Sequence, residues 1–271
     1  MSPLAQLRRA LVYLCLSVAA FVSVFPFYWM IVGATNTATD INIGKATFGN
    51  ALHDNVVNFF TQVDVPLIFY NTAKLAVLGT IFTLLVSSLA GYGFEMFRSR
   101  MRERIFAALL IMLSIPFAAM MVPLFMLMSR LHLMNTYTAI LLPSVASIFI
   151  IFYFRQSSKA FPGELRDAAR IDGLKEWQIF LYIYVPVMRS TYAAAVIIIF
   201  MANWNAYLWP LLVIQTSEKQ VITLVISALA SAYTPDFGVV MVGTVLATLP
   251  TIAVFFILQR RFVEGLLGSV K

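Results

Sequence analysis

Charged residues are scarce in this sequence. Asp, Glu, Lys and Arg together make up 11% of the 271 residues, whereas 61% of the residues are hydrophobic. A soluble globular domain contains roughly 25% charged residues. A chain with so few of them cannot cover its own surface with polar groups, so lipid must cover it instead. The composition therefore predicts an integral membrane protein.

Cysteine, histidine and phosphate-binding motifs are also almost absent. Cys15 is the single cysteine, which excludes a disulfide within the chain, and the two histidines, His53 and His132, lie far apart without a cysteine cluster nearby. The only Gly-Lys pair, Gly44 with Lys45, lacks the glycine that a phosphate-binding loop carries five residues earlier. We therefore expect no metal site, no ATP site and no catalytic site in this chain.

Long hydrophobic runs, by contrast, fill most of the chain. A helix needs about 20 apolar residues to cross a hydrocarbon core of roughly 30 Å. Six stretches meet or approach this length: Ala10–Ala34, Leu75–Phe94, Ile105–Met128, Tyr137–Phe154, Thr191–Ile214 and Val239–Leu258. The first is longer than the roughly 7 to 15 apolar residues of a signal peptide, so we interpret it as a retained span. Without alternating polar residues, these runs predict an all-α integral membrane protein with six transmembrane helices.

Basic residues are distributed unevenly between the connecting segments. Of the 19 Lys and Arg residues, only Lys45, Lys74, Arg130 and Lys219 fall on one side of the predicted spans, and the remaining fifteen fall on the other. Because basic residues accumulate on the cytoplasmic side, we predict that both termini are cytoplasmic. The membrane surface then accounts for the net charge of +7 without a nucleic-acid partner.

The predicted domain organisation is a single transmembrane domain over residues 1–271. It comprises an N-terminal span at 10–34, an external cap with short helices at 35–71, core spans within about 72–260 and a cytoplasmic segment at 155–190. We find no internal repeat of the kind that many secondary transporters carry. The cytoplasmic segment carries the clearest local signals.

The first part of this segment has the signals of a short capped helix. Pro162 suits the first helical turn, Glu164 and Asp167 favour the positive N-terminal end, and Gly173 can adopt the left-handed conformation that ends a helix. The two alanines after Asp167 leave room for another protein surface. Farther on, four apolar side chains at helical spacing predict a second helix: Trp177, Phe180, Leu181 and Tyr184. We expect this helix to end before Pro186 and to lie in the membrane interface.

The sequence ELRDAARIDGLKEWQIFLYIYVPV, which begins at Glu164, resembles the loop of the membrane subunits of bacterial binding-protein-dependent ABC importers. In that family an acidic residue, two alanines, a glycine and a proline recur in this order. The matching residues are Asp167, Ala168, Ala169, Asp172, Gly173 and Pro186. Asp167 stands where glutamate is usual. From the physics of the loop alone, a simple connector between two spans is the alternative.

The resemblance implies that this loop is a coupling helix that docks on a cytoplasmic ATPase. The residues to which it assigns docking are Glu164, Asp167, Ala168, Ala169, Asp172 and Gly173. Two other stretches, WNAYLWPLLV at 204–213 and QRRFVEGLLGSVK at 259–271, are similar to the carbohydrate branch of the family. Within that branch they look like the second permease of maltose-type and glycerol-phosphate-type systems.

The same resemblance implies the partners of this chain. They are a second permease subunit in a heterodimer, two copies of an ABC ATPase that binds ATP and Mg²⁺, an extracytoplasmic solute-binding protein and a saccharide. The chain itself would have no cofactor, would not be an enzyme and would lie in a bacterial inner membrane in contact with lipid.

Polar residues interrupt the fifth predicted span and form the candidate solute-facing patch: Asn203, Trp204, Asn205, Tyr207 and Trp209. Amides hydrogen-bond sugar hydroxyls, and Trp rings stack on the apolar face of a pyranose. The alternative is that the amides tie helices together and the Trp residues belong to an interfacial belt.

Charges within the spans bear on the choice of transporter class. We interpret Glu95, beside Arg98, as a solvated cytoplasmic charge, and we expect no buried carboxylate or charge pair in the spans. An ion-driven secondary transporter, which is the less favoured alternative, would need such a group. Glycerol phosphate is the other alternative solute, and it calls for Arg or Lys in the cavity. Prolines at Pro116, Pro123, Pro210 and Pro250 predict kinks that suit either gating or a static bundle.

Overall fold

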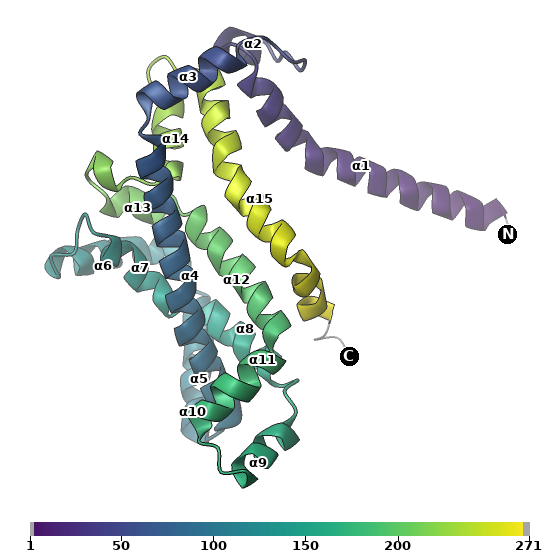
Figure 1. Cartoon of the computed structure of the whole chain (residues 1–271), viewed down its shortest axis with the longest axis vertical. Coiled ribbons are helices and arrows are strands. Elements are labelled where there is room, and N and C mark those ends of the chain that lie inside the picture. The colour runs from purple at the N-terminus through teal and green to yellow at the C-terminus, as the bar shows by residue number, and fades with distance from the viewer. Residues whose placement is uncertain (1–2, 268–271) are drawn as a thin grey trace. The chain divides into compact units, whose positions relative to one another are not determined.

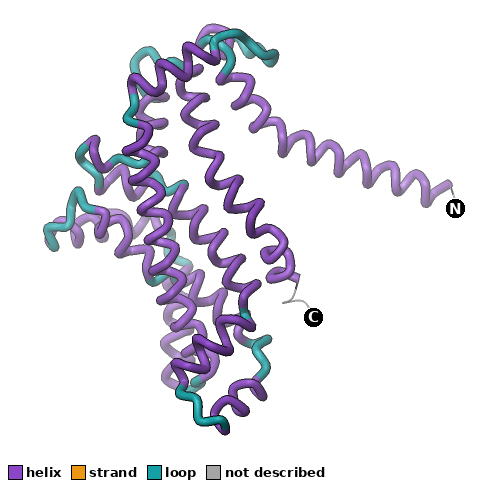
Figure 2. The backbone as a smooth tube through the Cα atoms, in the orientation of Figure 1, coloured by secondary structure: helices purple, strands orange, loops and turns teal. Residues whose placement is uncertain are grey.

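The computed structural model describes residues 3–267, and the side chains of residues 6–260. Throughout the described residues the chain forms helices joined by loops, without a strand (Figure 2). This confirms the all-α prediction. The chain divides into two compact units, one up to residue 65 together with 225–249, and the other from 66 to 224 together with the residues from 250 onward.

The first unit holds the N-terminal helix and the short helices that follow it. It contains α1 (Pro3–Ala34), α2 (Ala38–Asn42), α3 (Leu52–Gln62), most of α14 (Ile222–Ala230) and the first part of α15 (Phe237–Leu267). Thr37 and Asp40 form a capping box at the start of α2. The Asn55 amide donates hydrogen bonds of 2.9 Å to the carbonyls of Ala34 and Asn36, which fixes α3 against the end of α1. The predicted short helices at 35–71 are therefore present.

The second unit contains the remaining helices (Figure 1). They are α4 (Val65–Met96), α5 (Arg100–Leu113), α6 (Phe117–Arg130), α7 (Tyr137–Val145), α8 (Ile148–Ser158), α9 (Gly163–Ile171), α10 (Glu176–Ile179), a π-helical turn (Phe180–Tyr184), α11 (Val185–Val187), α12 (Arg189–Trp204), α13 (Leu208–Val213) and a 3₁₀ turn (Ser217–Lys219).

Five of the six predicted spans correspond to apolar helical segments of spanning length: Gln6–Ala34, Val65–Met96, Tyr137–Ser158, Arg189–Val213 and Phe237–Arg260. The prediction of one continuous helix over Ile105–Met128 is wrong, because α5 and α6 meet there at 102°. Proline has no N–H to donate, and it disfavours helical backbone in the residue before it, so the chain breaks just before Pro116. The number of spans is six if this bent pair is counted as one.

Two further spans of the second unit are also interrupted. α7 and α8 are separated at residues 146–147, and α12 and α13 at residues 205–207, which is the region where polar residues were expected to interrupt the fifth span. α4, by contrast, runs through 32 residues as one helix. The prediction that both termini are cytoplasmic stays a prediction, and the stretch at 259–271 extends outside the described residues.

Candidate functional site

The predicted capped helix of the segment at 155–190 is α9, and its boundaries lie close to those that the local signals indicate. Pro162 occupies the position before the first helical residue, and the helix ends at Ile171. Gly173 has a φ of 81°, the left-handed conformation expected of it, and its N–H donates to the Arg170 carbonyl at 3.0 Å. The helix and its glycine end are confirmed, whereas Pro162 precedes the first turn instead of lying in it.

α9 presents most of its side chains to solvent. Five of the six predicted docking residues are exposed: Glu164, Asp167, Ala168, Asp172 and Gly173. Ala169 is buried and packs inward. Leu165 and Ile171, which the sequence reading overlooked, are exposed apolar side chains, and Ile171 is 87% exposed. We call Glu164, Leu165, Asp167, Ala168 and Ile171 the α9 face.

Arg166 holds the opposite side of α9 against the end of α4. Its Nη1 atom donates to the Met96 carbonyl oxygen at 2.9 Å, and its guanidinium lies 4.6 Å from the centre of the Phe97 ring. Its Nη2 atom lies 3.2 Å from both carboxylate oxygens of Glu176. Arg166 and Ala169 are the buried residues of α9, so the helix depends on few contacts for its position.

Glu176 is the shared partner of several polar side chains in this region. Arg170 Nε donates to Glu176 Oε1 at 2.7 Å, and the Tyr92 hydroxyl donates to Oε2 at 3.3 Å. Partial burial raises the pKa of the Glu176 carboxyl, but the hydrogen bonds and positive charges of Arg170 and Arg166 outweigh it, so the pKa lies below its ordinary value. Glu176 is thus an anion that joins α9 to α10.

The second predicted helix of the segment is present but differs in shape and in its buried face. Phe180 and Tyr184 are buried, whereas Trp177 and Leu181 are exposed, so the four do not share one face. A π-helical turn begins at Phe180 and rotates the following side chains relative to a regular α-helix. The helix also continues through Pro186 instead of ending before it. The Tyr184 hydroxyl shares a hydrogen bond of 2.6 Å with Ser158 Oγ.

A second cluster of charges joins the ends of α4, α5 and α8. Glu95 pairs with Arg98 and Arg155, and Arg155 Nη2 also donates to Glu103 at 2.6 Å. Glu95 is buried, so its interpretation as a solvated charge is wrong, as is the expectation that the spans hold no buried carboxylate or charge pair. Because both carboxylates already have cationic partners, this cluster is a closed ion-pair network rather than a lone carboxylate.

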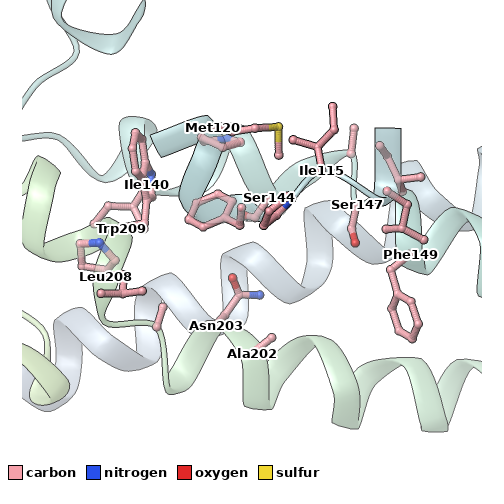
Figure 3. A pocket seen from close by; sticks show the side chains of 18 of the residues that line it. Ile115, Met120, Ile140, Ser144, Ser147, Phe149, Ala202, Asn203, Leu208 and Trp209 are labelled. Carbon is pink, nitrogen blue, oxygen red and sulfur yellow. The ribbon is translucent and has the colours of Figure 1, made fainter. Parts of the chain in front are cut away.

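The three helix breaks of the second unit meet at a cavity of about 830 Å³ (Figure 3). Its walls include Ile115 and Pro116 at the first break, Ser147 at the second, and Asn205 at the third. Four of the five predicted solute-facing residues line it: Asn203, Asn205, Tyr207 and Trp209. None of the described lining residues is charged.

Trp204 does not line this cavity. It is 3% exposed and packs against Phe69 and Phe200, with ring centres 6.1 and 5.6 Å away. Trp209 is at the wall, but its indole N–H already donates to the Ala139 carbonyl at 2.9 Å. Both rings pack within the second unit.

The two amides of the patch are held within their own helix. Asn203 Nδ2 donates to the Ile199 carbonyl at 3.0 Å, and Asn205 Nδ2 donates to the Met201 carbonyl at 2.9 Å. Asn203 projects from α12 into the cavity (Figure 3). With Ser144, Ser147 and Tyr207, these residues give an otherwise apolar cavity a few neutral hydrogen-bonding groups.

Known proteins resemble this chain over nearly its whole length. The family described as "Binding-protein-dependent transport system inner membrane component" matches residues 83–267. The lactose transport system permease protein LacG of Rhizobium radiobacter is 66% identical over 259 residues, with 96% of this chain and 95% of that protein covered. The sn-glycerol-3-phosphate transport system permease protein UgpE of Rhizobium meliloti (strain 1021) is 30% identical over 273 residues, with 96% of each covered.

The fold also matches a solved structure. A bacterial ABC transporter involved in the import of the acidic polysaccharide alginate contains a chain that superimposes with a TM-score of 0.84 at 19% sequence identity. The match covers 97% of this chain and 99% of that chain. At this identity the match establishes the fold alone.

Proposed function

This chain belongs to the family of inner membrane components of binding-protein-dependent transport systems, and from that premise we propose that it is the permease subunit of an ATP-driven importer of a neutral sugar. It forms half of the translocation pathway and couples that pathway to a cytoplasmic ATPase. The observation that carries the proposal is the α9 face, on which Ile171 is 87% exposed. An apolar side chain so exposed on a helix outside the spans is suited to a partner surface.

The chemistry of the cavity supports a neutral saccharide. Its polar lining groups are hydroxyls and amides, which hydrogen-bond sugar hydroxyls without requiring a charge on the solute. The relative named for lactose transport is 66% identical to this chain. Lactose is therefore the first solute to test.

Glycerol phosphate is the weaker alternative. The relative named for its transport is 30% identical to this chain. A phosphate calls for Arg or Lys nearby, and the described lining residues of the cavity include neither. In that alternative the second permease would have to supply the cations.

The remaining subunits follow from the family. A second permease completes the pathway, each permease docks on one copy of an ATPase, and an extracytoplasmic binding protein delivers the sugar. ATP and Mg²⁺ bind to the ATPase, and its closure moves the docked helices so that the cavity opens alternately to either side. The excess of basic residues in the segments that include α9 favours cytoplasmic termini in a bacterial inner membrane.

A pull-down from native membranes in mild detergent tests the docking. We expect the tagged wild-type chain to bring down an ATPase and a second permease. Ile171→Asp places a charge on the α9 face and should lose the ATPase while keeping the permease. Ile43→Asp is the control, because Ile43 is also exposed but lies in the first unit.

Uptake by proteoliposomes that contain the purified complex, its binding protein and internal ATP tests the solute. Radiolabelled lactose should accumulate, and excess glycerol 3-phosphate should not compete. A wild-type chain that purifies without an ATPase, and takes up lactose on an ion gradient alone, would instead support the secondary-transporter alternative.

A further inference from the structure

α4 is the longest uninterrupted helix of the second unit. It is a single helix of 32 residues, whereas the helix pairs α5 and α6, α7 and α8, and α12 and α13 are each interrupted. Half of its most apolar window is buried, more than in the other four single segments of spanning length. An unbroken helix keeps its hydrogen bonds along its whole length, so a displacement at one end reaches the other with little loss.

At one end, α4 contacts α9 through Arg166. The planar guanidinium of Arg166 binds the Met96 carbonyl, at the last residue of α4, and packs on the ring of the next residue, Phe97. Glu176 fixes the other edge of the same guanidinium. Three groups therefore hold Arg166 in one orientation, which suits arginine and does not suit the flexible point charge of lysine.

Farther along, α4 contacts the walls of the cavity. A Cβ atom placed on Gly79 would lie 2.9 Å from three atoms of the Asn203 amide, so this side chain rests directly on the α4 backbone. Thr83 Oγ1 donates to the Ser144 carbonyl at 3.0 Å. Gly79 and Thr83 are four residues apart and share one face of α4. Asn203 and Ser144 both line the cavity.

We propose that Arg166 and α4 form the link between the α9 face and the cavity, so that a movement of α9 reaches Asn203 and Ser144 through the Met96 carbonyl and the α4 backbone. The link spans the 17 residues from Gly79 to Met96, about 26 Å at 1.5 Å per residue. The inference rests on the proposed docking of α9 and assigns to Arg166 a positioning role. Rigid helices in contact at both ends are elements through which such coupling travels.

The single cysteine of this chain makes the link measurable. Cys15→Ser gives a background without cysteine, and Ala202→Cys then places one reporter on an exposed position of the cavity wall. The complex with its partner permease, ATPase and binding protein is reconstituted and treated with a membrane-impermeant maleimide, with ATP and vanadate or without nucleotide. The labelling rate of this chain alone is read from a gel, together with ATP hydrolysis.

With Arg166 intact, we expect nucleotide to change the labelling rate of the reporter. Arg166→Gln should keep the ATPase bound and hydrolysing, but should reduce the nucleotide-dependent change about fivefold or more, the size of an ordinary coupling free energy. Arg166→Lys should not restore it. Arg102→Gln is the matched control, because Arg102 also contacts Phe97 at the end of α4 but belongs to α5.

The outcomes distinguish a failure of the link from a failure of the proposed docking on which it rests. If the background chain with intact Arg166 does not retain the ATPase, the proposed function fails and the link fails with it. If Arg166→Gln retains the ATPase and the full labelling change, the link alone is overturned.

A second pair of variants tests the cavity end of α4. Gly79→Ala pushes a methyl group against the Asn203 amide and should alter the labelling change while leaving ATP hydrolysis in place. Gly93→Ala is its control, since a Cβ on Gly93 of the same helix meets no atom within 4 Å. If Gly79→Ala and Gly93→Ala give the same labelling change, the methyl group beside Asn203 has no effect. That result would contradict the link even if Arg166→Gln failed to fold.

Discussion

Arg155 Nε lies 3.5 Å from Glu95 Oε2, and less than a tenth of each side chain is exposed. The Arg155 guanidinium also lies 3.9 Å from the centre of the Phe106 ring and binds Glu103. This arrangement ties α8 to α4 and α5 at one end of the second unit. Two charges removed from water in this way stabilise a protein only while both are present, because a lone buried charge is costly.

We therefore expect Arg155→Met to destabilise the protein strongly. The substitution leaves the Glu95 carboxylate buried with only the exposed Arg98 beside it, and breaking a buried ion pair costs about 3–5 kcal/mol. The measurement is the free energy of unfolding of the purified protein in detergent, from denaturant titration followed by circular dichroism.

Arg98→Met is the control for this prediction. The Arg98 side chain is 59% exposed, so its loss should cost no more than about 1 kcal/mol. The double variant Glu95→Gln with Arg155→Met should recover part of the lost stability, because it removes the buried carboxylate that has lost its buried partner. Similar losses for Arg155→Met and Arg98→Met would contradict the role of burial.

Sequence signals close together along the chain predicted α9 well. Proline near the start, acids in the first turns and glycine after the end each act on the backbone within a few residues. The break at Pro116 has a local signal too, but a proline inside a span is compatible with a kink or a complete break. The 102° between α5 and α6 depends on packing that no single residue indicates.

The contacts that position α9 could not be read from the sequence. Arg166 binds the Met96 carbonyl, which lies 70 residues earlier in the chain. Because every residue has a backbone carbonyl, the residue type at that position does not indicate the contact. The burial of Glu95 depends on Arg155, 60 residues away. The π-helical turn at Phe180 likewise changed which aromatic side chains are buried, since the predicted face assumed a regular α-helix.

The lowered pKa of Glu176 predicts how α9 responds to acid. Because the folded-state pKa lies below the ordinary value for glutamate, the unfolded segment binds a proton more readily. The contribution of Glu176 is therefore complete above the unfolded pKa and is lost as the pH falls through the folded one. Hydrogen exchange of residues 163–172 should accelerate over that range.

Glu176→Gln should accelerate this exchange already at pH 7 and weaken its dependence on acid. The groups facing Glu176 are Arg166, Arg170 and Tyr92. Asp40→Asn is the control, since Asp40 also has a lowered pKa, chiefly from its hydrogen bond with Thr37, but belongs to the first unit. An unchanged acid response in Glu176→Gln would count against the assignment.

Two glycines at opposite ends of α9 should respond differently to the same change. A Cβ atom on either Gly163 or Gly173 meets nothing within 4 Å, so space does not distinguish them, but only Gly173 has a positive φ. Gly173→Ala should cost about 1–2 kcal/mol at the end of the helix, and Gly163→Ala should cost little. The readouts are hydrogen exchange at residues 170–174 and the amount of ATPase that co-purifies. Equal losses for both variants would show that the left-handed end is unimportant.

Substitutions of Asn205 and Trp204 should distinguish a residue that contacts the solute from one that packs in the core. Asn205 is exposed and lines the cavity, so Asn205→Ala should leave the free energy of unfolding nearly unchanged. It should raise the KM for lactose by up to about tenfold, because a hydrogen bond contributes about 0.5–1.5 kcal/mol. Trp204→Ala should do the reverse: it leaves a void beside Phe69 and Phe200, costs about 3–5 kcal/mol of stability and changes KM little in whatever protein remains folded. Uptake kinetics and denaturant titration of the same preparations measure both effects. An unchanged KM in Asn205→Ala would indicate that the second permease makes the sugar contacts, because Asn205 is the most exposed amide in the cavity of this chain.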